Sequence, residues 1–159
     1  MIIEIFADGI DRAHIEAKNW HVSCRGVIVK DDLILAEYMQ TSDVYNLPGG
    51  GIETKETFAE CCVREVAEET GVIVKIIEPT CVVMEYFVDE TWESHFFRCE
   101  VVSEDRNRQE LTTAEKQAKL TVKWYDLYEF LSILESYSSK NPHGDNIHQR
   151  ELIGLLNSI

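Results

Sequence analysis

One stretch of the sequence, Gly50 to Val72, constrains the fold more than any other part and reads GGIETKETFAECCVREVAEETGV. Thr57 followed by Glu60 has the form of a capping box, so a helix is predicted to begin at Phe58. Gly71 is a suitable residue just past its end. One arc of this helix is apolar and should face a core. It carries Ala59, Cys62, Val63, Val66 and Ala67.

A second arc of the same helix gathers the carboxylates of Glu65, Glu68 and Glu69, because residues three and four apart are helical neighbours. Two unit charges about 4 Å apart repel by about 4 kcal/mol at an effective dielectric constant of about 20. A divalent cation would supply the missing positive charge, and carboxylate oxygens favour Mg²⁺ or Mn²⁺. Taken alone, the patch fits a glutamate-rich solvated helix of an acidic protein equally well.

The complete spacing of the stretch distinguishes these alternatives. Gly50 and the residues that follow it at fixed intervals are Glu56, Arg64, Glu65, Val66, Glu68, Glu69, Gly71 and Val72. This pattern resembles the signature box of the Nudix hydrolases, which cleave nucleoside diphosphates linked to another group. The resemblance covers 23 residues, so it implies the chemistry of the family and leaves the substrate open.

The resemblance implies roles for the residues of the box. The cation ligands would be Glu65, Glu68, Glu69 and the carbonyl of Gly50. Arg64 would orient one of the carboxylates by a bidentate hydrogen bond. Glu56 is either an auxiliary metal ligand or the partner of Arg64. The implied activity is Mg²⁺-dependent hydrolysis of a nucleoside diphosphate derivative, with Mn²⁺ as a possible substitute. The alternative is a catalytically silent nucleotide-binding or regulatory module, which typically has a broken box, whereas this one is complete.

Residues outside the box supply further candidates. The general base is either Glu69 or Glu115, which precedes a predicted strand ending at Tyr125, where relatives often carry an extra glutamate. A solvated loop carboxylate is the plainer interpretation of Glu115. Arg25, on an early predicted strand, is a candidate for phosphate or ribose contact. Tyr45, just before the glycine turn, could stack on a base at the mouth of a pocket.

The order of the predicted elements gives the fold class. Strands are expected at Met1–Ala7, His21–Lys30, Leu33–Met39, Val72–Ile77, Thr80–Val88, His95–Val102 and Leu120–Tyr125. Polar loops are expected at 41–46 and 103–119, and two further helices follow Asp126 and cover 147–156. We therefore predict one α+β domain over residues 1–159. The resemblance implies an α/β/α sandwich around a mixed sheet. The first strand would lie at a sheet edge or pair across a homodimer.

Composition and net charge limit which binding partners and which cellular compartment are expected for this chain. The net charge of −14 disfavours attraction to nucleic acid or to an anionic membrane surface, so a small molecule is the expected partner. No apolar run approaches the roughly 18 residues of a membrane helix, and the start lacks a signal-peptide pattern. The expected location is the cytoplasm. Five cysteines without a CxxC pair are expected to be reduced thiols.

Overall fold

The computed structural model describes residues 1–15 and 19–159, and its eight strands form one mixed sheet. The strands are β1 (Ile2–Phe6), β2 (Asn19–Lys30), β3 (Leu33–Met39), β4 (Val44–Asn46), β5 (Gly49–Gly51), β6 (Val72–Tyr86), β7 (Glu90–Glu104) and β8 (Leu120–Asp126). The α-helices are α1 (Phe58–Thr70), α2 (Thr113–Gln117), α3 (Leu127–Ser136) and α4 (Gly144–Leu156). Short 3₁₀ turns lie at Arg12–His14 and Arg106–Arg108.

The sheet runs in the order β1-β6-β7-β2-β3-β4, with β5 beside β2 and β8 beside β3. The pairs β1–β6 and β2–β7 are parallel and the other pairs are antiparallel. The predicted hairpin of β2 and β3 is confirmed. Asp31 and Asp32 connect its strands with φ angles of 51° and 60°, which gives a two-residue turn the twist that the strands need.

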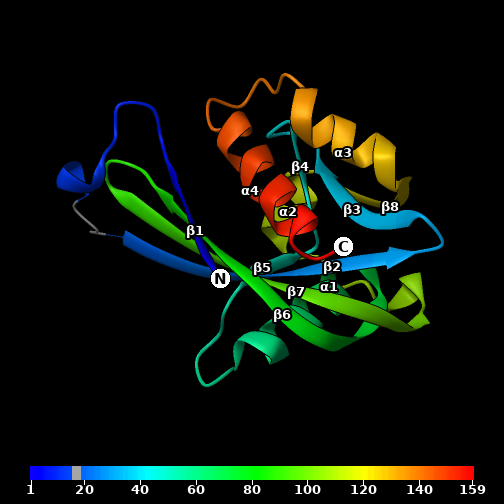
Figure 1. The fold of residues 1–159 in the computed structure, drawn as a ribbon. Coiled ribbons are helices and arrows are strands. Elements are labelled where there is room, and N and C mark those ends of the chain that lie inside the picture. Colours follow the sequence, from blue (N-terminus) through cyan, green and yellow to red (C-terminus); the bar gives the residue numbers. More distant parts are fainter. Residues whose placement is uncertain (16–18) are drawn as a thin grey trace.

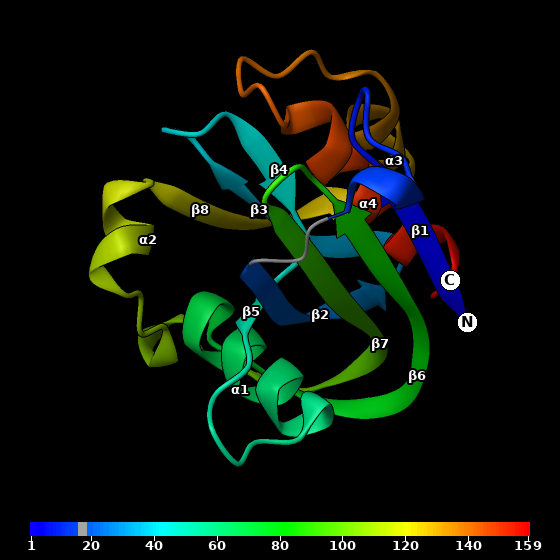
Figure 2. The same cartoon turned by 90° about the vertical axis from the view of Figure 1, so that its left-hand side faces the viewer.

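The helices cover the two faces of the sheet, as Figures 1 and 2 show, and this confirms the predicted α/β/α sandwich. Helix α1 packs on one face, and α3 and α4 pack on the other. Neighbouring strand residues contribute to opposite cores because side chains alternate along a strand. Val27 and Phe96 enter the core under α3 and α4, whereas Ile28 and Phe97 enter the core under α1.

Several elements differ from the prediction, and one of them, β7, begins five residues before the expected start at His95. Residues 72–86 form one long strand, because two register shifts, between Ile76 and Glu78 and between Pro79 and Cys81, accommodate Pro79, which lacks an N–H to donate. The expected polar loop at 41–46 contains β4, which pairs with β3 after a turn at Asp43. The expected loop at 103–119 contains α2, and α4 begins three residues earlier than predicted.

The predicted first strand is confirmed as β1, which lies at one edge of the sheet and pairs with β6. All five cysteines are free and buried, as expected for reduced thiols. Among the described residues, no helix combines the length and apolar character needed to cross a membrane.

Candidate active site

Helix α1 has the predicted ends, and these fix which of its side chains face the sheet. Thr57 Oγ1 accepts from the Glu60 N–H, and Glu60 Oε2 accepts from the Thr57 N–H, so the capping box is formed. Gly71 ends the helix with a φ of 74°. The apolar face packs Cys62 and Val66 fully buried against the sheet. The face carrying the box acids is thereby turned toward the glycine turn.

The glycines of β5 allow an unusually close approach between the turn and its surroundings. Gly49 has a φ of +151°, and a Cβ there would lie 2.0 Å from the carbonyl oxygen of Cys24 on the paired strand. A Cβ on Gly50 would lie 2.4 Å from Glu65 Oε2. The turn therefore needs glycine at one position for its backbone and at the next for a carboxylate of α1.

Arg64 donates hydrogen bonds to several carboxylates at the acidic face of α1. Its Nη1 donates to Glu65 Oε1 at 2.7 Å and to Glu68 Oε2 at 3.2 Å. Its Nε and Nη2 donate to the two oxygens of Glu56 at 2.7 and 2.9 Å, and Nη2 also reaches the Gly51 carbonyl at 3.1 Å. One planar guanidinium thus ties two of the box acids to the turn before the helix.

Glu56 behaves as the partner of Arg64 in this arrangement. Its Oε2 also accepts from the Glu53 N–H at 3.0 Å, so both oxygens are engaged by protein donors. The hydrogen bonds from Arg64 are the main cause that lowers the pKa of Glu56 to about 2. Of the two roles open for Glu56, this geometry favours orientation of Arg64.

The three box acids occupy different environments. Glu68 has a side chain that is 40% exposed, and Glu65 is half-buried. Burial raises the pKa of Glu65, with smaller contributions from Glu68 and Glu115 opposed by Arg64. Glu69 is only 3% exposed, although it was expected outside the buried face of the helix. It accepts from the Gly49 N–H at 2.7 Å, and burial raises its pKa to about 7.

These residues fit a hard divalent cation. The set offers carboxylate oxygens together with the backbone of a glycine turn that leaves room for Glu65. Within the described part of the chain, no three acidic, histidine or cysteine side chains already converge on one ion position. Arg64 Nη1 lies between Glu65 and Glu68 and supplies positive charge there.

A cavity of about 770 Å³ opens beside the start of α4, and neither Gly49–Gly51 nor α1 contributes a residue to its described lining. It is lined by the N-terminal loop, β2, β4, the β6–β7 turn and the start of α4, and its charged and aromatic lining includes Arg25, Glu85, Phe87, Trp92 and Arg150. Arg25 is 8% exposed, and its Nη1 donates to the carbonyls of Leu47 and Gly49 at 3.1 and 2.9 Å. This predicted substrate residue therefore joins the cavity wall to the glycine turn.

A buried ion-pair network behind the cavity was missed in the sequence. Arg150 Nη1 donates to Glu85 Oε2 at 3.1 Å, and Arg150 Nε donates to Glu151 Oε1 at 2.7 Å. Glu151 Oε2 accepts from the Leu47 N–H at 2.9 Å, so α4 holds the segment before the glycine turn. Charged residues within otherwise apolar segments, such as Glu85 in β6 and Glu37 in β3, were the available signal.

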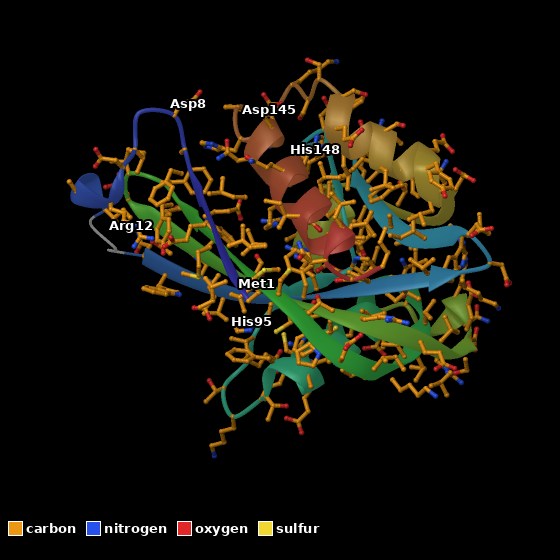
Figure 3. All side chains as sticks on the ribbon, viewed as in Figure 1. Met1, Asp8, Arg12, His95, Asp145 and His148 are labelled. Atoms are coloured by element: carbon orange, nitrogen blue, oxygen red, sulfur yellow. The ribbon has the colours of Figure 1, made fainter. Side chains whose placement is uncertain are left out.

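Tyr45 is not placed in the cavity. Its ring packs in an aromatic cluster with Tyr38 at 4.5 Å and Tyr137 at 5.1 Å between ring centroids. Its N–H donates at 3.0 Å to Nε2 of His148, a buried side chain of α4 labelled in Figure 3. Tyr45 therefore packs in this cluster and is not among the residues that line the cavity, and its stacking on a base stays a prediction.

Glu115 lies on α2, where the loop was expected. Its Oε2 accepts from the Thr112 N–H at 2.7 Å, which completes a capping box. The residue is half-buried, and its charge contributes to raising the pKa of Glu65. The structure therefore brings Glu115 into electrostatic contact with the acidic face of α1.

Comparison with known proteins agrees with this arrangement. A model of the NUDIX domain matches residues 20–147. An ADP-ribose pyrophosphatase of Methanocaldococcus jannaschii is 41% identical over 58 residues, which are 35% of this chain and 34% of that protein. The chain therefore matches about a third of the length of this curated relative.

Solved structures share the fold. A NUDIX hydrolase from Nitrosomonas europaea superposes with a TM-score of 0.64 at 23% identity, over 84% of this chain and 89% of that one. A UDP-X diphosphatase superposes with a TM-score of 0.59 at 18% identity, over 91% of this chain and 64% of that one. At these identities the likeness concerns the fold alone.

Proposed function

The chain belongs to the NUDIX domain family, and from this premise we propose that it hydrolyses the diphosphate linkage of a nucleoside diphosphate joined to another group, with Mg²⁺ or Mn²⁺ as the required cation. The observation that carries the proposal is the position of Glu65, whose carboxylate lies against the backbone of Gly50 at the acidic face of α1. A cavity large enough for a nucleoside derivative is lined in part by Arg25, whose Nη1 donates to the Gly49 carbonyl next to Gly50.

The proposed cation ligands are Glu65, Glu68, Glu69 and the carbonyl of Gly50. When bound, a divalent cation neutralises diphosphate oxygens and lowers the pKa of a water molecule. Arg64 then holds the carboxylates in place from the side of Glu56. Since Glu56 already accepts three hydrogen bonds from protein donors, an auxiliary ligand role is the less favoured one for it.

The proposed base is either Glu69 or Glu115. Glu69 touches the glycine turn but is buried, whereas Glu115 is only half-buried and can meet a water molecule. The proposed substrate contact of Arg25 uses the cavity wall, where its Nη1 is already engaged by two backbone carbonyls. Positioning of the glycine turn is therefore part of its role.

The proposed partner is a small molecule, bound by a single domain over residues 1–159. The proposed location of the protein is the cytoplasm. The names of similar proteins, ADP-ribose pyrophosphatase and UDP-X diphosphatase, make nucleoside diphosphate sugars the first compounds to test. With a net charge of −14, long-range attraction of nucleic acid is disfavoured. A silent nucleotide-binding module is the second candidate, although the box that such modules lose is complete here.

A substrate panel tests the proposal. ADP-ribose, UDP-sugars and dinucleoside polyphosphates would be incubated with Mg²⁺, and products would be measured as phosphate released by an added phosphatase. Nucleoside triphosphates, which a phosphatase attacks directly, would be followed with an added inorganic pyrophosphatase instead. A Glu65→Gln variant is the control, because contaminating hydrolases would survive the substitution. Hydrolysis of at least one compound by the parent alone is the expected result. Binding of nucleotides without turnover, across the whole panel and with either cation, would favour the silent module.

A further inference from the structure

Asn46 is a buried side chain of β4 that lines the cavity beside the start of α4. Val44 of the same strand lines the cavity too, because alternate residues of a strand share one face. Asn46 is only 3% exposed, and its Nδ2 donates to no acceptor of the described residues, including Glu37 opposite it on β3. A buried amide donor without an acceptor is costly, so a ligand that brings an acceptor to this place gains an interaction.

The orientation of the Asn46 amide is set by Arg150. Arg150 Nη2 donates to Asn46 Oδ1 at 3.3 Å. The guanidinium is itself fixed, because its Nη1 donates to Glu85 at 3.1 Å and its Nε donates to Glu151 at 2.7 Å. Rotation of the amide by half a turn would place Nδ2 against a donor of Arg150, so Oδ1 stays toward the arginine. Nδ2 is therefore a hydrogen-bond donor of fixed position in the wall of the cavity.

The cavity lining favours a neutral, flat group over a phosphate. Among the described lining residues, four carboxylates face two guanidinium groups, so the local charge repels an anion. Two aromatic residues also line the cavity and are held by neighbouring rings. Trp92 stacks on His21 at 4.2 Å, and Phe87 meets the edge of His143 at 5.2 Å, between ring centroids. In a nucleoside diphosphate derivative, the base is the neutral, flat group with hydrogen-bonding atoms at its edge.

We propose that this cavity binds the base of the substrate and that Asn46 selects bases with a keto oxygen, uracil over cytosine and hypoxanthine or guanine over adenine. The proposal rests on the proposed function, because it presumes a substrate that carries a nucleoside. A keto oxygen accepts from Nδ2, whereas the amino group of cytosine or adenine would set donor against donor. A site built to hydrogen-bond one substrate group rejects an analogue without it, because the buried protein group is then left unpaired.

Asn46→Asp tests this selection, because it exchanges the donor for an acceptor and keeps the oxygen that binds Arg150. The metal-free parent and variant would be titrated with uridine, cytidine, inosine and adenosine by NMR, which also follows the side-chain amide signal of Asn46. We expect the parent to bind uridine and inosine about tenfold or more tightly than cytidine and adenosine, with a shift of that amide signal. Asn46→Asp should bring each ratio to about one or reverse it.

Asn157→Asp is the matched control. It makes the same exchange at the end of α4, outside the described lining of the cavity, where Asn157 Nδ2 donates to the Ile153 carbonyl at 2.8 Å. Its binding ratios should equal those of the parent, and thermal melts show whether each variant is folded. If Asn46→Asp does not fold, Asn46→Ala removes the donor without adding charge and should bring each ratio to about one.

Three results would overturn the proposal. Equal binding within both pairs by the parent is expected if a ring nitrogen, present in every one of these bases or their partners, accepts from Nδ2 without regard to the keto group. An unchanged preference in the folded Asn46 variant would remove Asn46 from the selection. Binding of none of the four nucleosides would remove the base from the cavity. Nucleosides carry no phosphate and need no cation, so these results are separate from turnover, and hydrolysis of no compound in the substrate panel would defeat the proposed function alone.

Discussion

Arg64 and Glu56 are joined by two parallel hydrogen bonds of 2.7 and 2.9 Å, while the remaining nitrogen of the guanidinium reaches Glu65. Glu56 precedes α1, so the pair fixes the acidic face of the helix to the turn that leads into it. The planar fork matters because a lysine ammonium cannot make the same two bonds and still reach a second carboxylate.

Replacement of Arg64 by lysine should therefore lower kcat more than it raises KM. The charge is kept but the orientation of Glu65 is lost, and we expect kcat to fall roughly 10–100-fold. Steady-state kinetics on a verified substrate measures the split. Arg98→Lys is the matched control, since Arg98 pairs with Glu78 on the surface at 3.2 Å. An unchanged kcat would make Arg64 a surface cation without a role in the site.

Removal of divalent cations should abolish turnover. Glu65 and Glu68 share one cation, Arg64, and Glu69 accepts from the Gly49 N–H, so a diphosphate substrate would meet a face of net negative charge. Activity should vanish in excess chelator and return when Mg²⁺ or Mn²⁺ is added. The measurement is an initial rate on dialysed protein, with the melting temperature followed in parallel. Full turnover in chelator would contradict the mechanism.

Substitution of single box acids should separate catalysis from folding. Glu68→Gln and Glu69→Gln should each reduce turnover by roughly two to five orders of magnitude, or about 3–7 kcal/mol, by removing one charge of the site. The metal-free Glu68→Gln protein should keep its stability within about 1 kcal/mol, because its side chain is 40% exposed. Glu69→Gln should be no less stable, since burial disfavours the charged form of Glu69. Initial rates and thermal melts test both variants. Parental rates in both variants would disprove the assignment of α1 as the cation site.

Local signals in the sequence were enough to predict α1 and its acidic face. The capping pair Thr57 and Glu60 and the left-handed glycine at position 71 act within a few residues, and the structure has both. The apolar period likewise predicted Cys62 and Val66 in the core. These features depend on neighbours along the chain, so no knowledge of the remaining fold was needed to place them.

The support of the site depends on contacts that are distant in the sequence. Glu151 of α4 accepts a hydrogen bond from the backbone N–H of Leu47, 104 residues earlier in the chain. Helical periodicity alone put Glu69 outside the apolar face, whereas the glycine turn folds over the end of α1 and buries it. Such burial follows from tertiary packing and has no signature within one helix.

Asp43 should make the stability of the folded protein depend on pH between about 2 and 3.8. Hydrogen bonds from the Tyr137 hydroxyl, the Lys140 N–H and the Tyr38 hydroxyl lower its pKa from 3.8 to about 2. The folded state therefore prefers the charged form, so this contribution is present above pH 3.8 and is lost as the pH falls toward 2. Melting temperatures of the parent and Asp43→Asn should converge over that interval. Parallel curves would show that Asp43 does not titrate differently in the folded state.

Gly50 and Gly51 offer a matched pair of substitutions that isolates the contact between the turn and α1. Neither glycine has a positive φ, so alanine is allowed by the backbone at both positions. A Cβ at Gly50 would lie 2.4 Å from Glu65 Oε2, whereas the nearest atom to a Cβ at Gly51 is the Val22 carbonyl oxygen at 4.0 Å. Gly50→Ala must therefore displace the carboxylate, and Gly51→Ala displaces nothing.

We expect Gly50→Ala to lower kcat about 100-fold, because small misplacements of a catalytic group have effects of that size. Its stability should change by about 1 kcal/mol or less, since the far end of a flexible side chain can move. Gly51→Ala should keep its kcat within about twofold of the parent, because its Cβ enters open space. Alanine preserves the backbone carbonyl at position 50, so the loss reports on Glu65 rather than on the carbonyl as a ligand. Kinetics and melts of the two variants check this, and a parental kcat in Gly50→Ala would show that the position of Glu65 is not critical for the reaction.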